Sequence, residues 1–194
     1  MPQVGSGCLW NQVYRELQKH NRAVVGGRAG SVGVGGFLVG GGNTWFTAQR
    51  GWGCDNIVAA EVVLTDGEIV IADRSNYSDL IQVLKGGGNN FGIVTRFTLT
   101  TVRFDQVWGG ILMTPKDTIP KICRMTTEFV ARVEQNTNNN LIVVIGYQPD
   151  LKDVTAVVLV VNTEGVTDDP VFDEWKELPK ITETIKTTSP GLKN

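Results

Sequence analysis

The chain has 194 residues, of which 41% are hydrophobic and 20% charged, and its formal net charge is −2. This near-neutral balance argues against a nucleic-acid partner, because nucleic-acid-binding domains carry a basic face. No apolar run reaches the roughly 18 residues of a membrane-spanning helix, and the N-terminus lacks the basic-then-apolar order of a signal peptide. The three cysteines form no CxxC pair and only one histidine accompanies them, so we predict no metal site.

The first predicted element is an amphipathic helix that begins near Cys8 and ends by Asn21. Its apolar side chains recur at helical spacing and fall on one face: Leu9, Trp10, Val13, Tyr14 and Leu17. A short apolar segment at residues 23–25 follows and is predicted as a strand.

Residues 26–42 form a glycine segment, GGRAGSVGVGGFLVGGG, in which more than half of the residues are glycine. Glycine has no Cβ and adopts positive φ readily, so its backbone can approach a ligand closely. Successive amides that point into one concavity bind anions. Between Leu17 and Cys54 the chain also carries four cations and no acid. We therefore predict a loop that holds a diphosphate. The alternative is a flexible linker, but such linkers are polar, whereas this segment includes Val32, Phe37 and Leu38.

Two β-branched runs follow at residues 57–64 and 68–72. The Asp66-Gly67 dipeptide between them predicts a two-residue hairpin connection. Ser78 is predicted to cap a short helix that reaches Leu84 and buries Leu80, Ile81 and Leu84. A second glycine cluster at residues 86–92 then leads into a strand at residues 93–100.

Composition changes near residue 110, since 20 of the 23 glycines precede it and six of the seven prolines follow it. This change predicts a boundary at about residues 103–106 and hence two domains, residues 1–104 and residues 105–194. In the second domain we expect strands at residues 107–113, 141–147 and 155–162. A helix is predicted from Pro120 to about Glu134, and a last helix from Asp169-Pro170. The inner faces of these helices are predicted to be Ile122, Met125, Phe129 and Val133 in the first, and Phe172, Trp175 and Leu178 in the second.

Two common phosphate-binding motifs do not fit. The G-x-G-x-x-G fingerprint fails because Leu38 stands at its sixth position counted from Gly33. The P-loop pattern fails because Gly42 stands where its lysine is required. Nucleotide hydrolysis is therefore not expected.

Three stretches carry a resemblance to a known family: residues 4–42, residues 50–70 (RGWGCDNIVAAEVVLTDGEIV) and residues 78–99 (SDLIQVLKGGGNNFGIVTRFTL). In this order they resemble the FAD-binding domain of the vanillyl-alcohol oxidase / p-cresol methylhydroxylase family, and within it the fungal berberine-bridge-like branch. The resemblance implies an α+β fold, in which residues 1–104 are the second subdomain of a PCMH-type FAD-binding domain. Residues 105–194 resemble part of the antiparallel-sheet substrate domain, so the chain is expected to be truncated at both ends.

The resemblance also implies cofactor-binding residues. Main-chain groups of Gly30, Ser31, Val32, Gly33, Val34, Gly35 and Gly36 would line the diphosphate and the flavin edge, with Gly42 and Asn43 continuing that wall. Gly92, Ile93 and Val94 would pass the adenosine half. Asp55 would approach polar groups of the cofactor, or would act as a turn aspartate that bonds its own backbone. Val32 corresponds to a position beside the flavin where a small side chain leaves room for dioxygen.

The family's covalent flavin attachments have no counterpart here. No R-S-G-G-H-like loop precedes Val4, and Ala29 stands at the position of the attaching cysteine, so FAD would bind non-covalently. No catalytic residue can be assigned. One hypothesis is an FAD-dependent oxidoreductase that, in full-length form, takes a hydride from an alcohol, a sugar or a secondary metabolite. The alternative is a non-catalytic remnant that binds FAD weakly or not at all. The expected partner is a small-molecule substrate, with no nucleic acid and no membrane. Full-length relatives are often secreted, but the location of this chain and its oligomeric state stay open.

Overall fold

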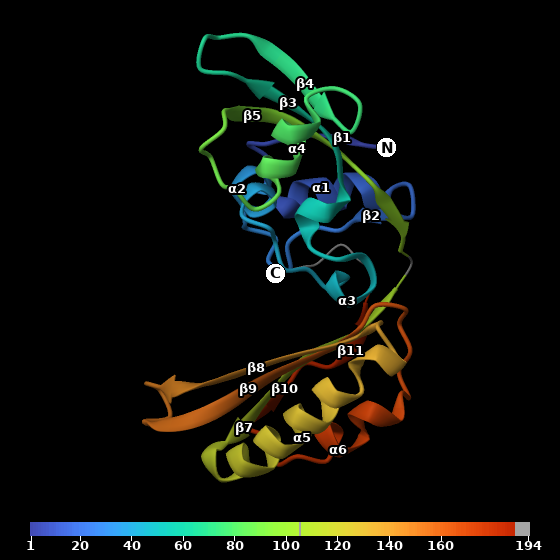
Figure 1. The fold of residues 1–194 in the computed structure, drawn as a ribbon. Helices are drawn as coiled ribbons and strands as arrows, with labels where there is room; N and C mark the ends of the chain where they lie inside the picture. Colours follow the sequence, from blue (N-terminus) through green and yellow to red (C-terminus); the bar gives the residue numbers. More distant parts are fainter. Residues whose placement is uncertain (105, 189–194) are drawn as a thin grey trace. The chain divides into compact units, whose positions relative to one another are not determined.

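The computed structural model describes residues 1–104 and 106–188, which fall into two compact units (Figure 1). Unit 1 lies within residues 1–104 and unit 2 within residues 106–188. Residue 105 and residues 189–194 of the predicted second domain lie outside the described residues. The assignment of residues 1–104 and 105–194 to partial FAD-binding and substrate domains stays a prediction.

Unit 1 is built on a four-stranded antiparallel sheet with helices packed against it. The strand order is β1 (Gln3–Gly5), β5 (Ile93–Leu99), β3 (Ile57–Val63) and β4 (Ile69–Asp73). A separate ribbon pairs β2 (Arg22–Val24) with β6 (Thr101–Arg103). The helices are α1 (Trp10–Gln18), α2 (Val34–Val39), α3 (Thr47–Arg50) and α4 (Ser78–Leu84), with a 3-10 turn at Gly53–Asn56.

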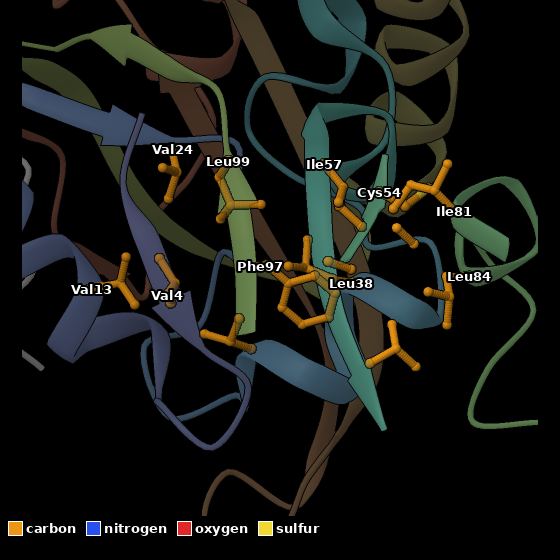
Figure 2. Close-up of a cluster of buried hydrophobic side chains, with 14 of the residues drawn as sticks. Val4, Val13, Val24, Leu38, Cys54, Ile57, Ile81, Leu84, Phe97 and Leu99 are labelled. Atoms are coloured by element: carbon orange, nitrogen blue, oxygen red, sulfur yellow. The ribbon is translucent and has the colours of Figure 1, made fainter. Parts of the chain in front are cut away.

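The core of unit 1 joins sheet and helices through alternating strand residues (Figure 2). Val62 from β3 and Phe97 from β5 are fully buried, and they pack with Leu38 from α2 and Leu84 from α4. The period-two alternation of β3 and β5 explains this, because alternate residues of a strand face the same side of the sheet.

The glycine segment is not a continuous loop, and this part of the prediction was wrong. Its second half forms α2, although glycine disfavours helix by about 1 kcal/mol per residue. Val34 and Leu38, one helical turn apart, are both fully buried. Tertiary burial of these two side chains therefore outweighs the weak propensity of the glycines around them.

Two local predictions also need correction. The hairpin loop between β3 and β4 has three residues, because the Gly67 amide bonds the Leu64 carbonyl and the Leu64 amide bonds the Glu68 carbonyl. Within this loop only Gly67 has positive φ (88°), whereas a two-residue type I′ turn needs it at both central positions. Ser78 does not cap α4: it is the first helical residue, and Tyr77 precedes it in the left-handed region without a side-chain cap.

Unit 2 is an antiparallel sheet with helices on one face (Figure 1). The strand order is β10 (Thr182–Glu183), β7 (Val107–Pro115), β9 (Asp153–Asn162) and β8 (Asn139–Gln148), and β11 (Lys186–Thr188) also pairs with β7. The helices are α5 (Ile119–Ala131) and α6 (Asp173–Lys176), with 3-10 turns at Lys116–Thr118, Val133–Gln135 and Pro170–Phe172. The predicted inner faces are confirmed for Ile122, Met125 and Phe129 of α5 and for Phe172, Trp175 and Leu178, which are all buried. Val133 is the exception, because α5 ends at Ala131 and Val133 is half-buried in the 3-10 turn that follows.

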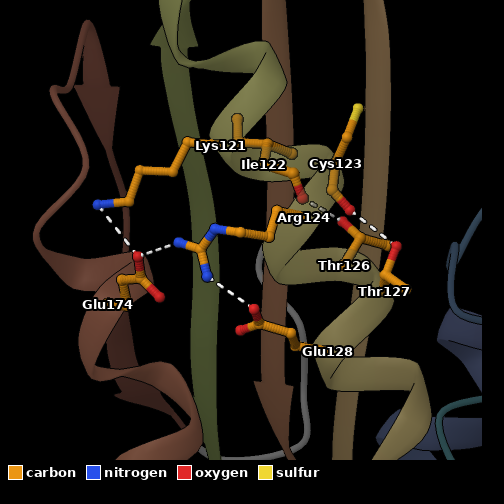
Figure 3. A network of polar contacts seen from close by, with 8 residues as sticks. All are labelled: Lys121, Ile122, Cys123, Arg124, Thr126, Thr127, Glu128 and Glu174. Atoms are coloured by element: carbon orange, nitrogen blue, oxygen red, sulfur yellow. Dashed lines mark hydrogen bonds and ion pairs between the residues drawn. The ribbon is translucent and has the colours of Figure 1, made fainter.

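Ion pairs join the outer surfaces of α5 and α6 (Figure 3). Arg124 bonds Glu128 at 2.8 Å and Glu174 at 2.5 Å, and Lys121 lies 3.3 Å from Glu174. The hydrogen bond from Arg124 is the main reason why the pKa of Glu174 lies below its ordinary value. All four side chains are about half exposed, so these pairs orient the helices more than they stabilise them.

Candidate cofactor-binding site

The first half of the glycine segment is fastened to the N-terminal part of unit 1, chiefly to α1. An isolated bridge pairs Leu9 with Gly33. The bridge consists of the bonds from Trp10 N to Val32 O (3.1 Å) and from Val34 N to Cys8 O (2.9 Å). Three further hydrogen bonds of 2.8–3.0 Å have the same effect: Asn11 N to Gly30 O, Gly35 N to Ser6 O and Tyr14 Oη to Gly27 O. Residues 27–35 thus have a defined backbone path, which a flexible linker would not have.

Trp10 explains why the segment begins with two glycines. Its ring is fully buried, and a Cβ on Gly26 or on Gly27 would come within 2.5 Å of ring atoms. The edge of Phe37 packs against the same ring, with centroids 5.3 Å apart. These two glycines therefore serve close packing on Trp10, and the sequence alone gave them no such role.

The backbone amides of the turn at residues 30–36 are of two kinds, those with a hydrogen-bond acceptor and those without one. Val32, Val34 and Gly35 donate to carbonyls of the protein. Within the described parts of the chain, the amides of Gly30, Ser31, Gly33 and Gly36 have no hydrogen-bond acceptor. A Cβ on Gly33 or Gly36 would meet nothing within 4 Å, so the space in front of them is open. Free amide donors on a fixed backbone, with open space beside Gly33 and Gly36, fit the oxygens of a diphosphate.

The neighbouring surface is apolar and weakly cationic. Val32 is 40% exposed, and Ser31 beside it is exposed. The Arg28 guanidinium lies 5.4 Å from the centre of the Trp45 ring, an arrangement that holds a positive charge near the turn.

Burial is the main cause that raises the pKa of the Cys54 thiol, so this cysteine stays protonated at neutral pH.

Gly42 and Asn43 lie at the end of the glycine segment and contact the next loop. Gly42 has φ of 81°, and a Cβ there would meet the Phe37 ring at 2.4 Å. The Gly42 carbonyl accepts from the Gly53 amide at 2.8 Å, and Asn43 Oδ1 accepts from Thr47 Oγ1 at 3.1 Å. Both residues are thus held by unit 1 itself.

Asp55 bonds its own local backbone, as the turn-aspartate interpretation predicts, while its contact with the cofactor stays a prediction. Its Oδ2 accepts from the Trp52 amide at 2.8 Å, which closes the 3-10 turn at Gly53–Asn56. The carboxylate bonds its own local backbone, and this fixes the loop that supports Gly42.

Gly92 precedes β5, and Ile93 and Val94 begin this strand and pair with Val63 and Val62 of β3. A Cβ on Gly92 would lie 2.7 Å from a methyl group of Val62, and φ of 139° there also requires glycine. Ile93 is 71% exposed, so its side chain is available for contact. The second glycine cluster reaches α2 through Gly88, whose amide donates to the Val39 carbonyl at 3.0 Å.

A pocket of about 280 Å³ lies in unit 2, and none of its lining residues belongs to the predicted site. Asp169 at its wall accepts from Asn136 and Asn139 at 2.8 Å and from the Val171 amide. Burial alone would raise the pKa of Asp169, but these hydrogen bonds outweigh it and hold the pKa below its ordinary value. This network consists of internal contacts that fix the loop before α6.

Comparisons with known proteins show which proteins this chain is similar to. Residues 3–73 match a family model described as an FAD binding domain. An FAD-dependent monooxygenase of Cochliobolus heterostrophus is 37% identical over 191 residues, which are 97% of this chain and 36% of that protein. The chain therefore resembles the FAD-linked oxidoreductases of the vanillyl-alcohol oxidase / p-cresol methylhydroxylase family, and these matches support FAD as its cofactor.

Solved structures share the fold. A VAO-type flavoprotein of Myceliophthora thermophila superposes with a TM-score of 0.77 at 22% identity, over 96% of this chain and 35% of that one. A BBE-like protein of Arabidopsis thaliana gives 0.79 at 20% identity, over 96% and 39%. The predicted α+β fold and family resemblance are thereby confirmed. The chain spans little more than a third of the length of the curated relative. The part of the chain that the structure describes contains no helix long and apolar enough to cross a membrane.

Proposed function

We propose that this chain binds FAD non-covalently, with the diphosphate on the turn at residues 30–36. The free amides of Ser31, Gly33 and Gly36 carry this proposal. Val32 and the paired residues of the turn supply its shape. Gly42 and Asn43 continue the wall, Asp55 fixes the loop behind them, and Gly92, Ile93 and Val94 contact the adenosine half.

The proposed reaction is oxidation of an alcohol, a sugar or a secondary metabolite. When bound, FAD supplies the oxidising group that takes a hydride from the substrate. This chain's own residues hold and orient the cofactor. By the family resemblance, the small side chain of Val32, which is 40% exposed, would leave room for dioxygen beside the flavin, which favours an oxidase.

The direct test is a titration of the purified chain with FAD, followed by flavin fluorescence. Gly33→Val is the decisive variant, since a Cβ there would meet no protein atom within 4 Å and the added side chain would extend into the open space beside the free amide. Gly146→Val is the matched control, because Gly146 also has open space around its Cβ position and lies in unit 2. We expect the first variant alone to weaken binding.

Two results would contradict the proposal. Equal FAD affinity of Gly33→Val and Gly146→Val would show that the turn does not hold the diphosphate. A colourless wild-type protein that is indifferent to FAD would favour the alternative, a non-catalytic relative that binds the cofactor weakly or not at all.

A further inference from the structure

Among the described residues, strand β8 forms an edge of the sheet in unit 2 and lacks the usual protection against pairing. It is ten residues long, NNLIVVIGYQ, with no charged residue and no proline. Its register with β9 continues without a bulge. Val144, Ile145 and Tyr147 are 53%, 48% and 60% exposed. Natural edge strands are normally short, charged, kinked or covered, because an open edge is a template for another strand.

The pairing with β9 determines which β8 groups face outward. In an antiparallel pair, every second residue exchanges both of its backbone hydrogen bonds with the partner strand. The Thr163 amide bonds the Asn138 carbonyl in continuation of the β8–β9 register, so even-numbered residues of β8 face β9. The odd-numbered residues face the open edge, and Leu141, Val143, Ile145 and Tyr147 have no backbone partner in the described residues.

We propose that β8 pairs with β8 of a second copy of this chain, antiparallel about a two-fold axis at Val144. This register places Leu141 opposite Tyr147 and Val143 opposite Ile145, each twice by symmetry. All four outward-facing residues thus exchange their amide and carbonyl bonds with the partner strand. The sheets of the two copies become one continuous sheet.

Neighbouring registers satisfy fewer groups. A two-fold axis at Val143 would pair Tyr147 with Asn139, whose amide already donates to the Asn136 carbonyl. An axis at Ile145 would pair Leu141 with Pro149, which has no amide hydrogen. Registers that set an odd-numbered residue opposite an even-numbered one are excluded. The two-fold axis is perpendicular to the sheet, so residues directly opposite one another must lie on the same face.

The side chains favour the same register. Directly opposite residues of an antiparallel pair contact one another, so Ile145 packs on Val143 of the other copy and Tyr147 packs on Leu141. Val144 meets its own symmetry mate. The three most exposed apolar side chains of β8 all gain apolar neighbours, and no charge is brought into the interface.

Sedimentation velocity of the full chain across a wide concentration range tests the association. We expect a species of twice the 21.1 kDa chain mass at high concentration. Ile145→Lys should raise the dissociation constant by roughly tenfold or more. The contact between Ile145 and Val143 of the other copy occurs twice in the two-fold dimer, so the substitution removes both. Ile71→Lys is the matched control, because Ile71 is an equally exposed isoleucine (49%) on β4, the edge strand of unit 1. Its dissociation constant should equal that of the wild type.

A cross-linking experiment tests the register and does not depend on the lysine variants. Val144→Cys, made in a Cys123→Ser background to remove the exposed thiol, should give a disulfide-linked dimer under oxidised glutathione. Ile71→Cys in the same background should not. A chain that stays monomeric at every concentration would overturn the proposal. So would equal weakening by both lysine variants, association through a segment other than β8, or failure of the Val144→Cys variant to cross-link.

Discussion

Gly36→Ala separates two effects that the structure predicts at one position. Gly36 lies in α2, is exposed, and has φ outside the left-handed region. A Cβ there would meet nothing within 4 Å, so a methyl group fits the protein without repacking. The same methyl group would stand in the space that the proposed diphosphate occupies.

The expected magnitudes have opposite signs. Alanine is better than glycine in a helix by about 0.5–1 kcal/mol, so the variant should unfold at a temperature higher by about 2–8 °C. Forcing a methyl group against a bound ligand costs about 1–3 kcal/mol, which raises the Kd for FAD by about 5- to 150-fold. Greater stability of the free protein with weaker cofactor binding is the signature of the proposed site.

The assay combines thermal unfolding followed by circular dichroism without FAD and a fluorescence titration with FAD. Gly35→Ala is the matched control in the same helix, because its Cβ would lie 3.0 Å from the Ser6 carbonyl oxygen and should lower the unfolding temperature. Unchanged FAD affinity in Gly36→Ala, together with a raised unfolding temperature, would refute the assignment of the diphosphate to this turn.

Two further substitutions, one in each unit, test hydrogen bonds that hold the local structure in place. Tyr14→Phe removes the hydroxyl that donates to the Gly27 carbonyl at 2.8 Å, and urea unfolding should show a loss of about 0.5–1.5 kcal/mol with weaker FAD binding. Asp169→Ala leaves the buried Asn139 amide without its acceptor and should cost about 1–3 kcal/mol, whereas the exposed neighbour Asp168 can be replaced by alanine with little effect. Since the pKa of Asp169 is lowered in the folded chain, its contribution is present above the ordinary pKa of about 4 and is lost as the pH falls through the lowered value. Acid titration of the unfolding free energy should show this loss in the wild type and not in Asp169→Ala; an identical acid profile of the two proteins would contradict the role of the carboxylate.

Long segments with a clear period were predictable from the sequence. The apolar spacing of Ile122, Met125 and Phe129 identified the buried face of α5, and the β-branched runs identified β8 and β9. In these segments local propensity and tertiary burial favour the same structure. The family of the chain followed from ordered motifs, which carry more information than composition.

Other features depend on contacts that a single sequence does not reveal. Helix α2 forms in spite of its glycines because Val34 and Leu38 reach the core. Strands β10 and β11 have two and three residues, too few for a period to appear. Trp10 was identified as a core residue, but its contact with Gly26 and Gly27 joins positions far apart in the chain. Which amides of the turn are free also depends on such contacts, because Ser6 and Cys8, which precede α1, supply the carbonyl acceptors for Gly35 and Val34.

Helix α2 contacts three distant parts of unit 1 within six residues. Its first residues bond the chain before α1, its Phe37 ring lies against Gly42 and Gly53, and its Val39 carbonyl receives the Gly88 amide. A local opening of this one short helix would therefore release three loops together. Conversely, any ligand that rests on its first turn restricts the thermal fluctuations of all three, so cofactor affinity and the local order of unit 1 are coupled through a single element.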